Sequence, residues 1–212
     1  MKSENGRSMV EMLGVLAIIG VLSVGAIAGY SKAMFKYKLN KHAEAVSMLI
    51  NNALQLKGQL SFNPNTQTCY GNLFKKMNLL PDGIKYKSNC DIRDMWFNGS
   101  MSIYYANDDL GNGKHNNFGG IGFSFSPTEE GAEVCRNIVL AAKENAANLW
   151  VLETYKYLND TSSGNAQIIG FLYGDSYCTA WKSCLRDLDL NKTEKLCNDC
   201  NERACGLYVL WK

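Results

Sequence analysis

One carboxylate in this chain has a position that suggests a specific chemistry. Glu11 is the last charged residue before an uncharged run that extends from Met12 to Tyr30. A helix rises about 1.5 Å per residue, so this run would reach roughly 28 Å, close to the hydrocarbon thickness of a bilayer. A carboxylate at the edge of such a helix is costly in lipid unless a cation pairs with it. The chemistry expected of Glu11 is therefore charge pairing at the N-terminal end of a membrane-length helix.

The residues that lead up to Glu11 form a specific combination. Mostly polar residues end at Gly6, Arg7 follows, and Glu11 stands four positions later at the start of the apolar run. From Gly6 to about Lys36 the chain resembles the prepilin N-terminus of type IV pilins and type II secretion pseudopilins. The resemblance implies that a membrane-bound prepilin peptidase removes a leader, Met1–Gly6, and that Arg7 becomes the N-methylated first residue. Arg7 stands where the family usually has phenylalanine or methionine.

The resemblance also implies what the carboxylate pairs with. In a helical filament of identical subunits, Glu11 would pair with the amine of Arg7 on a neighbouring subunit, since each charge is otherwise unpaired in an apolar core. Such a pair fixes register more than it adds stability. Four glycines provide small-residue notches for close helix packing, and the last two fit the small-xxx-small pattern. They are Gly14, Gly20, Gly25 and Gly29.

Membrane topology follows from the same resemblance. It implies a single-pass protein of the bacterial inner membrane with an extracytoplasmic head, which a pilus assembly platform adds to an extracellular or periplasmic filament. The lysines after the run favour the opposite orientation by the positive-inside rule. We place the head outside because of the resemblance and the cysteines. The lysines are Lys32, Lys36, Lys38 and Lys41.

Two other interpretations of the N-terminal segment remain open. A secretory signal peptide would use Lys2 as its basic region, Met12–Gly25 as its apolar region and Ala26–Ala28 as its cleavage site. An ordinary membrane anchor would keep the whole segment. Both lead to a membrane-anchored or secreted extracytoplasmic binding protein that does not polymerise.

The helix is expected to continue beyond the membrane run as far as Leu60. No proline or glycine occurs between Tyr30 and Gly58, and apolar residues recur every three or four positions. The predicted organisation is leader 1–6, membrane or filament-core helix 7–30, amphipathic half of the same helix 31–60 and globular head 61–212. The fold class is α+β, with the long helix packed on an antiparallel sheet and disulfides in the head, as in pilins.

All eight cysteines follow the apolar segment, which favours disulfides in an exported domain. We expect Cys69 to pair with Cys90 and the C-terminal cluster to brace its own region, with one member left for Cys135. Structural zinc and CxxC redox chemistry at Cys197–Cys200 are alternatives, but no second CxxC is present. The eight are Cys69, Cys90, Cys135, Cys178, Cys184, Cys197, Cys200 and Cys205.

The head pattern predicts strands with a few short helices. Met101, Ile103 and Tyr105 alternate on one face, as do Ile121, Phe123 and Phe125, so these segments are expected to form an antiparallel pair. Further strands are predicted at 149–158, 167–173 and 207–211. Helices are predicted after a Ser126–Glu129 capping box, at 180–188, and at a short segment capped by Asn191 and Glu194. Residues 61–99 have turn signals but no clear periodicity.

The sequence does not suggest an enzyme. His42 is expected at the helix surface and His115 in a turn, and neither belongs to a nucleophile or metal motif. The acidic turn Asp108–Gly113 is a weak calcium candidate without EF-hand spacing. A net charge of +2 offers no case for nucleic acid. No cofactor is expected, and the predicted role is structural.

Overall fold

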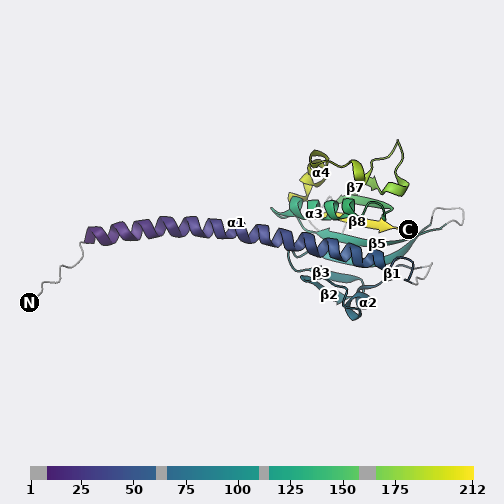
Figure 1. The fold of residues 1–212 in the computed structure, drawn as a ribbon, viewed down its shortest axis with the longest axis horizontal. Coiled ribbons are helices and arrows are strands. Elements are labelled where there is room, and N and C mark those ends of the chain that lie inside the picture. The colour runs from purple at the N-terminus through teal and green to yellow at the C-terminus, as the bar shows by residue number, and fades with distance from the viewer. Residues whose placement is uncertain (1–8, 61–65, 110–114, 158–165) are drawn as a thin grey trace, which may run out of the picture. The chain divides into compact units, whose positions relative to one another are not determined.

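The computed structural model describes residues 9–60, 66–109, 115–157 and 166–212. The chain divides into two compact units, Met1–Lys38 and Leu39–Lys212. Helix α1, Met9–Gln55, begins in the first unit and ends in the second (Figure 1). The helix ends five residues before the predicted Leu60, and Gly58 then takes a positive φ of 80°. Glycine adopts that left-handed conformation without steric penalty, so Gly58 lets the chain turn away after the helix has ended.

The second unit is built on one antiparallel sheet, in which the strand order is β2-β3-β4-β5-β8-β6-β7 and β1 pairs with β4. The strands are β1 (Thr68–Cys69), β2 (Ile84–Ser88), β3 (Asp91–Asp94), β4 (Ser100–Asp109), β5 (His115–Phe125), β6 (Val151–Tyr157), β7 (Ala166–Tyr173) and β8 (Cys205–Trp211). The other helices are α2 (Gly71–Lys76), α3 (Gly131–Glu144) and α4 (Leu190–Cys197), with 3-10 turns η1 (Asp175–Tyr177), η2 (Leu185–Asp187) and η3 (Asn198–Asn201). A long helix and an antiparallel sheet with disulfides are thus present, as the sequence predicted.

The pairing of β4 with β5 follows the predicted alternation. Met101 lies opposite Phe123 and Ile103 opposite Ile121, so the apolar side chains of both strands share one face. The two strands are longer than expected, because β4 continues to Asp109 and β5 begins at His115. Asp108 and Asp109 are therefore strand residues, whereas the rest of the calcium candidate, residues 110–113, lies outside the described residues.

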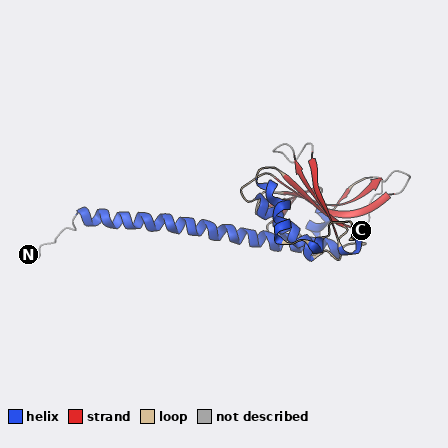
Figure 2. Ribbon diagram, turned by 90° about the horizontal axis from the view of Figure 1, so that it is seen from above, coloured by secondary structure: helices blue, strands red, loops and turns tan. Residues whose placement is uncertain are grey.

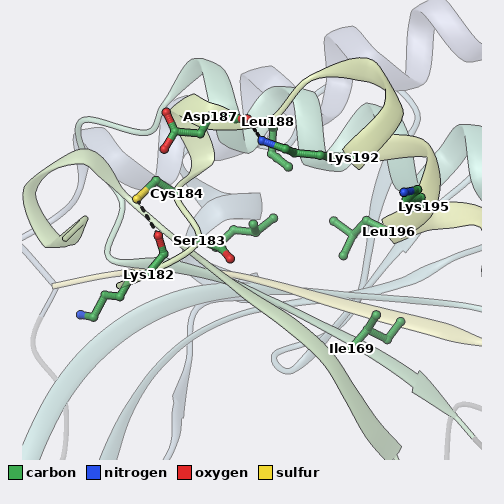
Figure 3. A pocket seen from close by; sticks show the side chains of 10 residues that line it. Ile169, Lys182, Ser183, Cys184, Asp187, Leu188, Lys192, Lys195 and Leu196 are labelled. Atoms are coloured by element: carbon green, nitrogen blue, oxygen red, sulfur yellow. Dashed lines mark hydrogen bonds between the residues drawn. The ribbon is translucent and has the colours of Figure 1, made fainter. Parts of the chain in front are cut away.

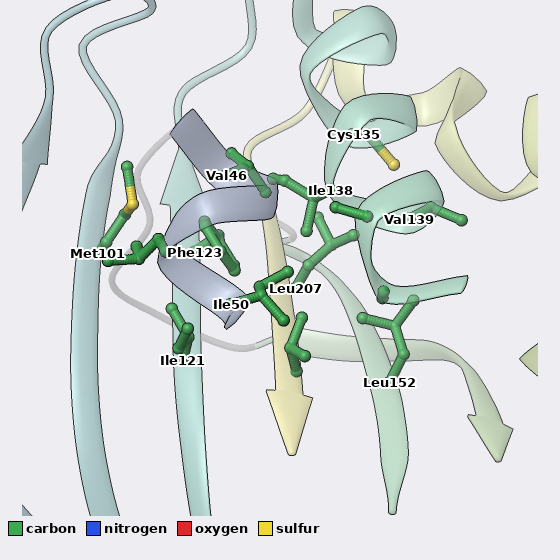
Figure 4. Packing of buried hydrophobic residues seen from close by; sticks show 14 of the residues in the cluster. Val46, Ile50, Met101, Ile121, Phe123, Cys135, Ile138, Val139, Leu152 and Leu207 are labelled. Atoms are coloured by element: carbon green, nitrogen blue, oxygen red, sulfur yellow. The ribbon is translucent and has the colours of Figure 1, made fainter. Parts of the chain in front are cut away.

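The core of the second unit lies between the sheet and two helices. The last turns of α1 and the buried face of α3 cover the same side of the sheet (Figure 2). Figure 4 shows this packing close up, with side chains from α1, α3, β5 and β8 in one cluster: Val46, Ile50, Ile138, Val139, Phe123 and Leu207. Each of these side chains is at most 2% exposed. Burial of a side chain of this size contributes about 1.5–3 kcal/mol, so this layer dominates the stability of the head.

The start of α3 differs from the prediction. The expected Ser126 capping box is absent: the helix begins at Gly131, and its N-cap, Glu130, makes no side-chain cap. Instead Asn201 of η3 accepts a hydrogen bond from the Ala132 N–H at 2.8 Å. A cap from a distant segment thus satisfies one of the N–H groups in the first turn of α3 that have no partner within the helix.

Two further predictions about the head were wrong. Residues 180–188 do not form an α-helix and contain only the 3-10 turn η2, because the Cys178–Cys184 disulfide closes a tight loop and the Tyr173 N–H donates to the Ser183 carbonyl at 2.9 Å. Helix α4 is capped by Asp189, whose side chain accepts from the Lys192 N–H at 2.7 Å, rather than by Asn191 or Glu194. The stretch 61–99, which lacked periodicity, contains α2, β2 and β3.

Candidate functional site

The N-terminal part of α1 presents apolar side chains on every side. Between Met9 and Met34 each residue is exposed, and the large apolar side chains as far as Tyr30 range from 52% exposed at Val15 to 80% at Met9. Among the described residues α1 is the one helix long and apolar enough to cross a membrane. A helix that is apolar all round needs lipid or other helices around it. This segment is therefore a surface for contact with lipid or with other helices.

Glu11 lies in the first turn of this helix. An acidic side chain there is favoured by the partial positive charge of the helix N-terminus. Beyond it the helix carries no charged residue as far as Tyr30. Glu11 therefore stands at the start of the uncharged run, and the charge pairing expected of it stays a prediction. The predicted cleavage site, Gly6 and Arg7, lies outside the described residues.

The four helix glycines leave room for close contact with another helix. A Cβ atom placed on any of them would meet nothing within 4 Å, so none of the described residues fills the notches. Small residues at such positions let two helix backbones approach closely in an apolar environment. The glycines are Gly14, Gly20, Gly25 and Gly29.

His42 is buried, contrary to the prediction that it lies at the helix surface. Its side chain is 1% exposed, and its Nε2 lies 3.5 Å from Oδ2 of Asp94 at the end of β3. On the other side of the ring, the Asn137 amide of α3 donates to the Leu39 carbonyl at 3.0 Å and lies 3.1 Å from His42 Nδ1. With Nδ1 accepting from this amide, the ring proton is on Nε2 and faces Asp94. The sequence could have predicted this burial, because His42 precedes the apolar Val46 by one helical turn and therefore lies on the same face of the helix.

Burial controls the charges of this pair. It lowers the pKa of His42 from 6.5 to about 4 and raises the pKa of Asp94 from 3.8 to about 6. At neutral pH His42 is uncharged and Asp94 is ionised, with its carboxylate accepting the Trp96 N–H at 2.8 Å. The two side chains are 1% and 3% exposed, which closes the pair to a substrate. The cluster therefore joins α1, β3 and α3.

The cysteines form four disulfides and leave no free thiol. Cys69 pairs with Cys90, as expected, and Cys135 takes one member of the C-terminal cluster, Cys197. The remaining pairs are Cys178–Cys184 and Cys200–Cys205. The CxxC motif is thus divided between two disulfides, which contradicts both the zinc and the redox alternatives.

One group of possible metal ligands occurs among the described residues, formed by Cys178, Cys184 and Asp187. Its two sulfur atoms are joined to each other in a disulfide. Zinc binds cysteine as the thiolate, so an oxidised pair does not supply these ligands. The group is not a zinc site.

A cavity of about 500 Å³ lies between β7, the loop closed by Cys184, and α4 (Figure 3). Its apolar floor includes Ile169 and Leu196, and its rim includes Lys182 and Lys192. Both lysines have partners within the head: Lys192 donates to the Asp187 carbonyl at 2.8 Å, and Lys182 lies 4.0 Å from the Tyr173 ring centroid. Both rim lysines thus already contact other residues of the head. The residues that line the cavity do not include a nucleophile with an acid–base pair beside it.

No family model matches the chain, and no curated protein or solved structure matches it. The function is therefore inferred from the residues and their geometry. Within the described residues, most of the exposed large apolar side chains lie on α1. The exposed apolar part of α1 is the candidate functional site.

Proposed function

We propose that the chain is the structural subunit of a type IV pilus-like filament. It is made as a precursor, held in the bacterial inner membrane by Met12–Tyr30 and cleaved after Gly6 by a prepilin peptidase. An assembly platform then adds the subunit to a helical filament outside the cytoplasm. The observation that carries the proposal is the apolar N-terminal part of α1, which is exposed on every side and has a carboxylate in its first turn.

The exposed helix supports a change of surroundings during assembly. A single apolar helix is stable in a bilayer, where its backbone groups are satisfied internally. Outside the bilayer the same surface is stable only when other helices surround it. Identical subunits packed in a helical array supply such neighbours, and the four open glycine notches allow them to approach closely.

Glu11 supports the proposal through the cost of leaving a charge unpaired. After cleavage the amine of Arg7 would carry a positive charge near the apolar surface of the next subunit. In a filament core, pairing with Glu11 would bring the two opposite charges together, whereas loss of one partner of a buried pair costs about 3–5 kcal/mol. This penalty selects the axial offset at which the two charges meet, so the pair sets register.

The test uses Glu11→Gln, which keeps the shape of the side chain and removes its charge. The variant is expressed as the sole copy, and filaments are sheared from the cells and quantified against the membrane-bound pool. We expect filament subunits to fall at least about tenfold while the membrane pool stays normal, because 1.4 kcal/mol already gives a factor of ten. The matched control is Glu44→Gln, an exposed position on the same helix.

Two outcomes would count against the proposal. Wild-type levels of filament with Glu11→Gln would show that charge pairing is not needed. No filament from the unaltered chain would favour a membrane-anchored or secreted binding protein that does not polymerise.

A further inference from the structure

A second cavity, of about 470 Å³, lies on the face of the sheet opposite to the helices. Along β8, Leu207 and Val209 belong to the main core, whereas Tyr208 and Leu210 line this cavity. Alternate residues of a strand point to opposite faces, so the cavity is on the outer side. We call it the aromatic groove. Its principal side chains are Tyr104, Phe118, Trp150, Glu153, Tyr155 and Tyr208.

Glycines on the strands beneath the rings make room for the groove. A Cβ atom at Gly122 would lie 2.9 Å from the Tyr208 ring, and one at Gly120 would lie 3.2 Å from the Tyr104 ring. Both glycines belong to β5, and β4 and β8 flank that strand. Because they have no side chains, the tyrosines of the neighbouring strands lie down on the sheet instead of projecting from it.

The rings form walls that stand at large angles to each other. Tyr155 and Tyr208 have centroids 5.3 Å apart and an interplanar angle of 84°. Tyr104 and Phe118 meet at 80° and 6.4 Å. A flat platform of parallel rings suits a planar or sugar ligand, whereas perpendicular rings present several π-faces to one compact group. The groove is therefore lined by two pairs of rings, each pair packed edge to face.

Of the charged groups at the groove, Glu153 belongs to the lining, whereas the Lys212 ammonium lies over the Trp150 ring. The Tyr155 hydroxyl donates to Oε2 of Glu153 at 2.7 Å, and no residue that lines the groove is basic. Burial first, and then neighbours that include the Glu153 charge, raise the pKa of Tyr104 and Tyr155 above 10. Burial, and then the hydrogen bond and the charge of Tyr157, raise the pKa of Tyr208 to about 12. The phenols therefore stay neutral at physiological pH, and the groove favours a cation.

The chain itself places a cation on one of these rings. The Lys212 ammonium lies 3.9 Å from the centroid of Trp150. A cation within about 6 Å of a ring centroid is attracted by the negative π-face. The Trp150 ring, at one end of the groove, therefore already has a cation on its π-face.

We propose that the aromatic groove binds a quaternary ammonium group, the trimethylammonium of choline or of a choline-bearing headgroup. Several π-faces and one carboxylate complement a bulky, weakly hydrated cation. A metal ion would need several oxygen ligands, and the groove has a single carboxylate. An anion would meet the Glu153 charge. The proposal is independent of filament assembly, because every residue it uses belongs to the second unit.

The first experiment compares two ligands of nearly the same shape. The full chain, in a detergent without choline groups, is titrated calorimetrically with choline and with its neutral carbon analogue, 3,3-dimethyl-1-butanol. We expect choline to bind at least about tenfold more tightly, as one or two cation–π contacts provide. Equal affinity for both ligands would overturn the proposal. The absence of choline binding up to about 10 mM would overturn it as well.

Variants then locate the site. Glu153→Gln, which keeps the side-chain shape, is expected to weaken choline binding at least about fivefold, and Tyr208→Leu to weaken it further. Trp181→Leu is the control, because Trp181 is 96% exposed and outside the groove. Unchanged affinity in Glu153→Gln with an unchanged melting temperature would contradict the assigned carboxylate. Glycerophosphocholine as a third ligand distinguishes a lipid headgroup, which would bind more tightly than choline, from free choline.

Discussion

The buried pair of His42 and Asp94 gives a prediction whose sign can be worked out for each partner. Folding lowers the pKa of His42 from 6.5 to about 4, so the unfolded chain binds more protons between these values. Acid therefore destabilises the head through His42. Folding raises the pKa of Asp94 from 3.8 to about 6, so the folded chain binds more protons in that window. Acid therefore stabilises the head through Asp94.

The two effects nearly cancel in the unaltered chain. Integrating each proton-binding difference between pH 7 and pH 4.5 gives a loss of about 2 kcal/mol from His42 and a gain of about 2 kcal/mol from Asp94. Removing one partner exposes the contribution of the other. From pH 7 to 4.5 we expect Asp94→Asn to lose about 2 kcal/mol of stability relative to the unaltered chain, and His42→Gln to gain about 2 kcal/mol.

The assay is urea unfolding of the full chain in detergent at both pH values, followed by tryptophan fluorescence, since all four tryptophans lie beyond residue 60. Other carboxylates titrate equally in every variant, so differences between variants isolate the pair. Glu44→Gln is the control, because its carboxylate is exposed. If the two variants changed with pH in the same direction, or both followed the unaltered chain, the buried pair would not titrate as the structure requires.

Two further predictions concern the stability of the head. Replacing both cysteines of a disulfide by serine should lower the unfolding free energy by about 4 kcal/mol for Cys135–Cys197, about 3 for Cys69–Cys90 and about 2 for Cys178–Cys184, because the unfolded loops shorten in that order. Denaturant titration checks the order, and a reversed ranking would contradict the loop-closure account. The second prediction concerns a glycine: Gly131→Ala should destabilise the head by about 1–3 kcal/mol, since the new Cβ would lie 2.0 Å from the Cys200 carbonyl oxygen. Gly170→Ala, where the nearest atom is 3.6 Å away, should change the melting temperature little, and equal effects would be the contrary result.

The parts of the fold that the sequence predicted depend on local patterns. The alternation around Ile103 and Ile121 was sufficient to predict the antiparallel pairing of β4 with β5, but not the register that the structure shows. The position of β8 between β5 and β6 was not predictable in this way, because it pairs strands that are distant in the chain. The cap of α3 by Asn201 was missed for the same reason. Local propensity favoured Ser126, and a tertiary contact replaced it.

The candidate sites divide along the same line. Glu11 and the helix glycines were found from sequence because a membrane-length apolar run gives their meaning locally. His42 was misplaced because a histidine was assumed to be at the surface, although its spacing from Val46 put it on the buried stripe. The aromatic groove could not be found from sequence, since its rings come from separate strands that the insertion of β8 brings together.

The most direct test of the proposed filament subunit is the intact mass of the protein as it leaves the cell, with sequencing of its N-terminal peptide. We predict that the mature chain begins at Arg7 with a methylated amine and retains Met12–Tyr30. A chain that begins at Gly29 would have lost the apolar helix to a signal peptidase, and a chain that keeps Met1 would be an unprocessed anchor. Either of these results would contradict the proposal.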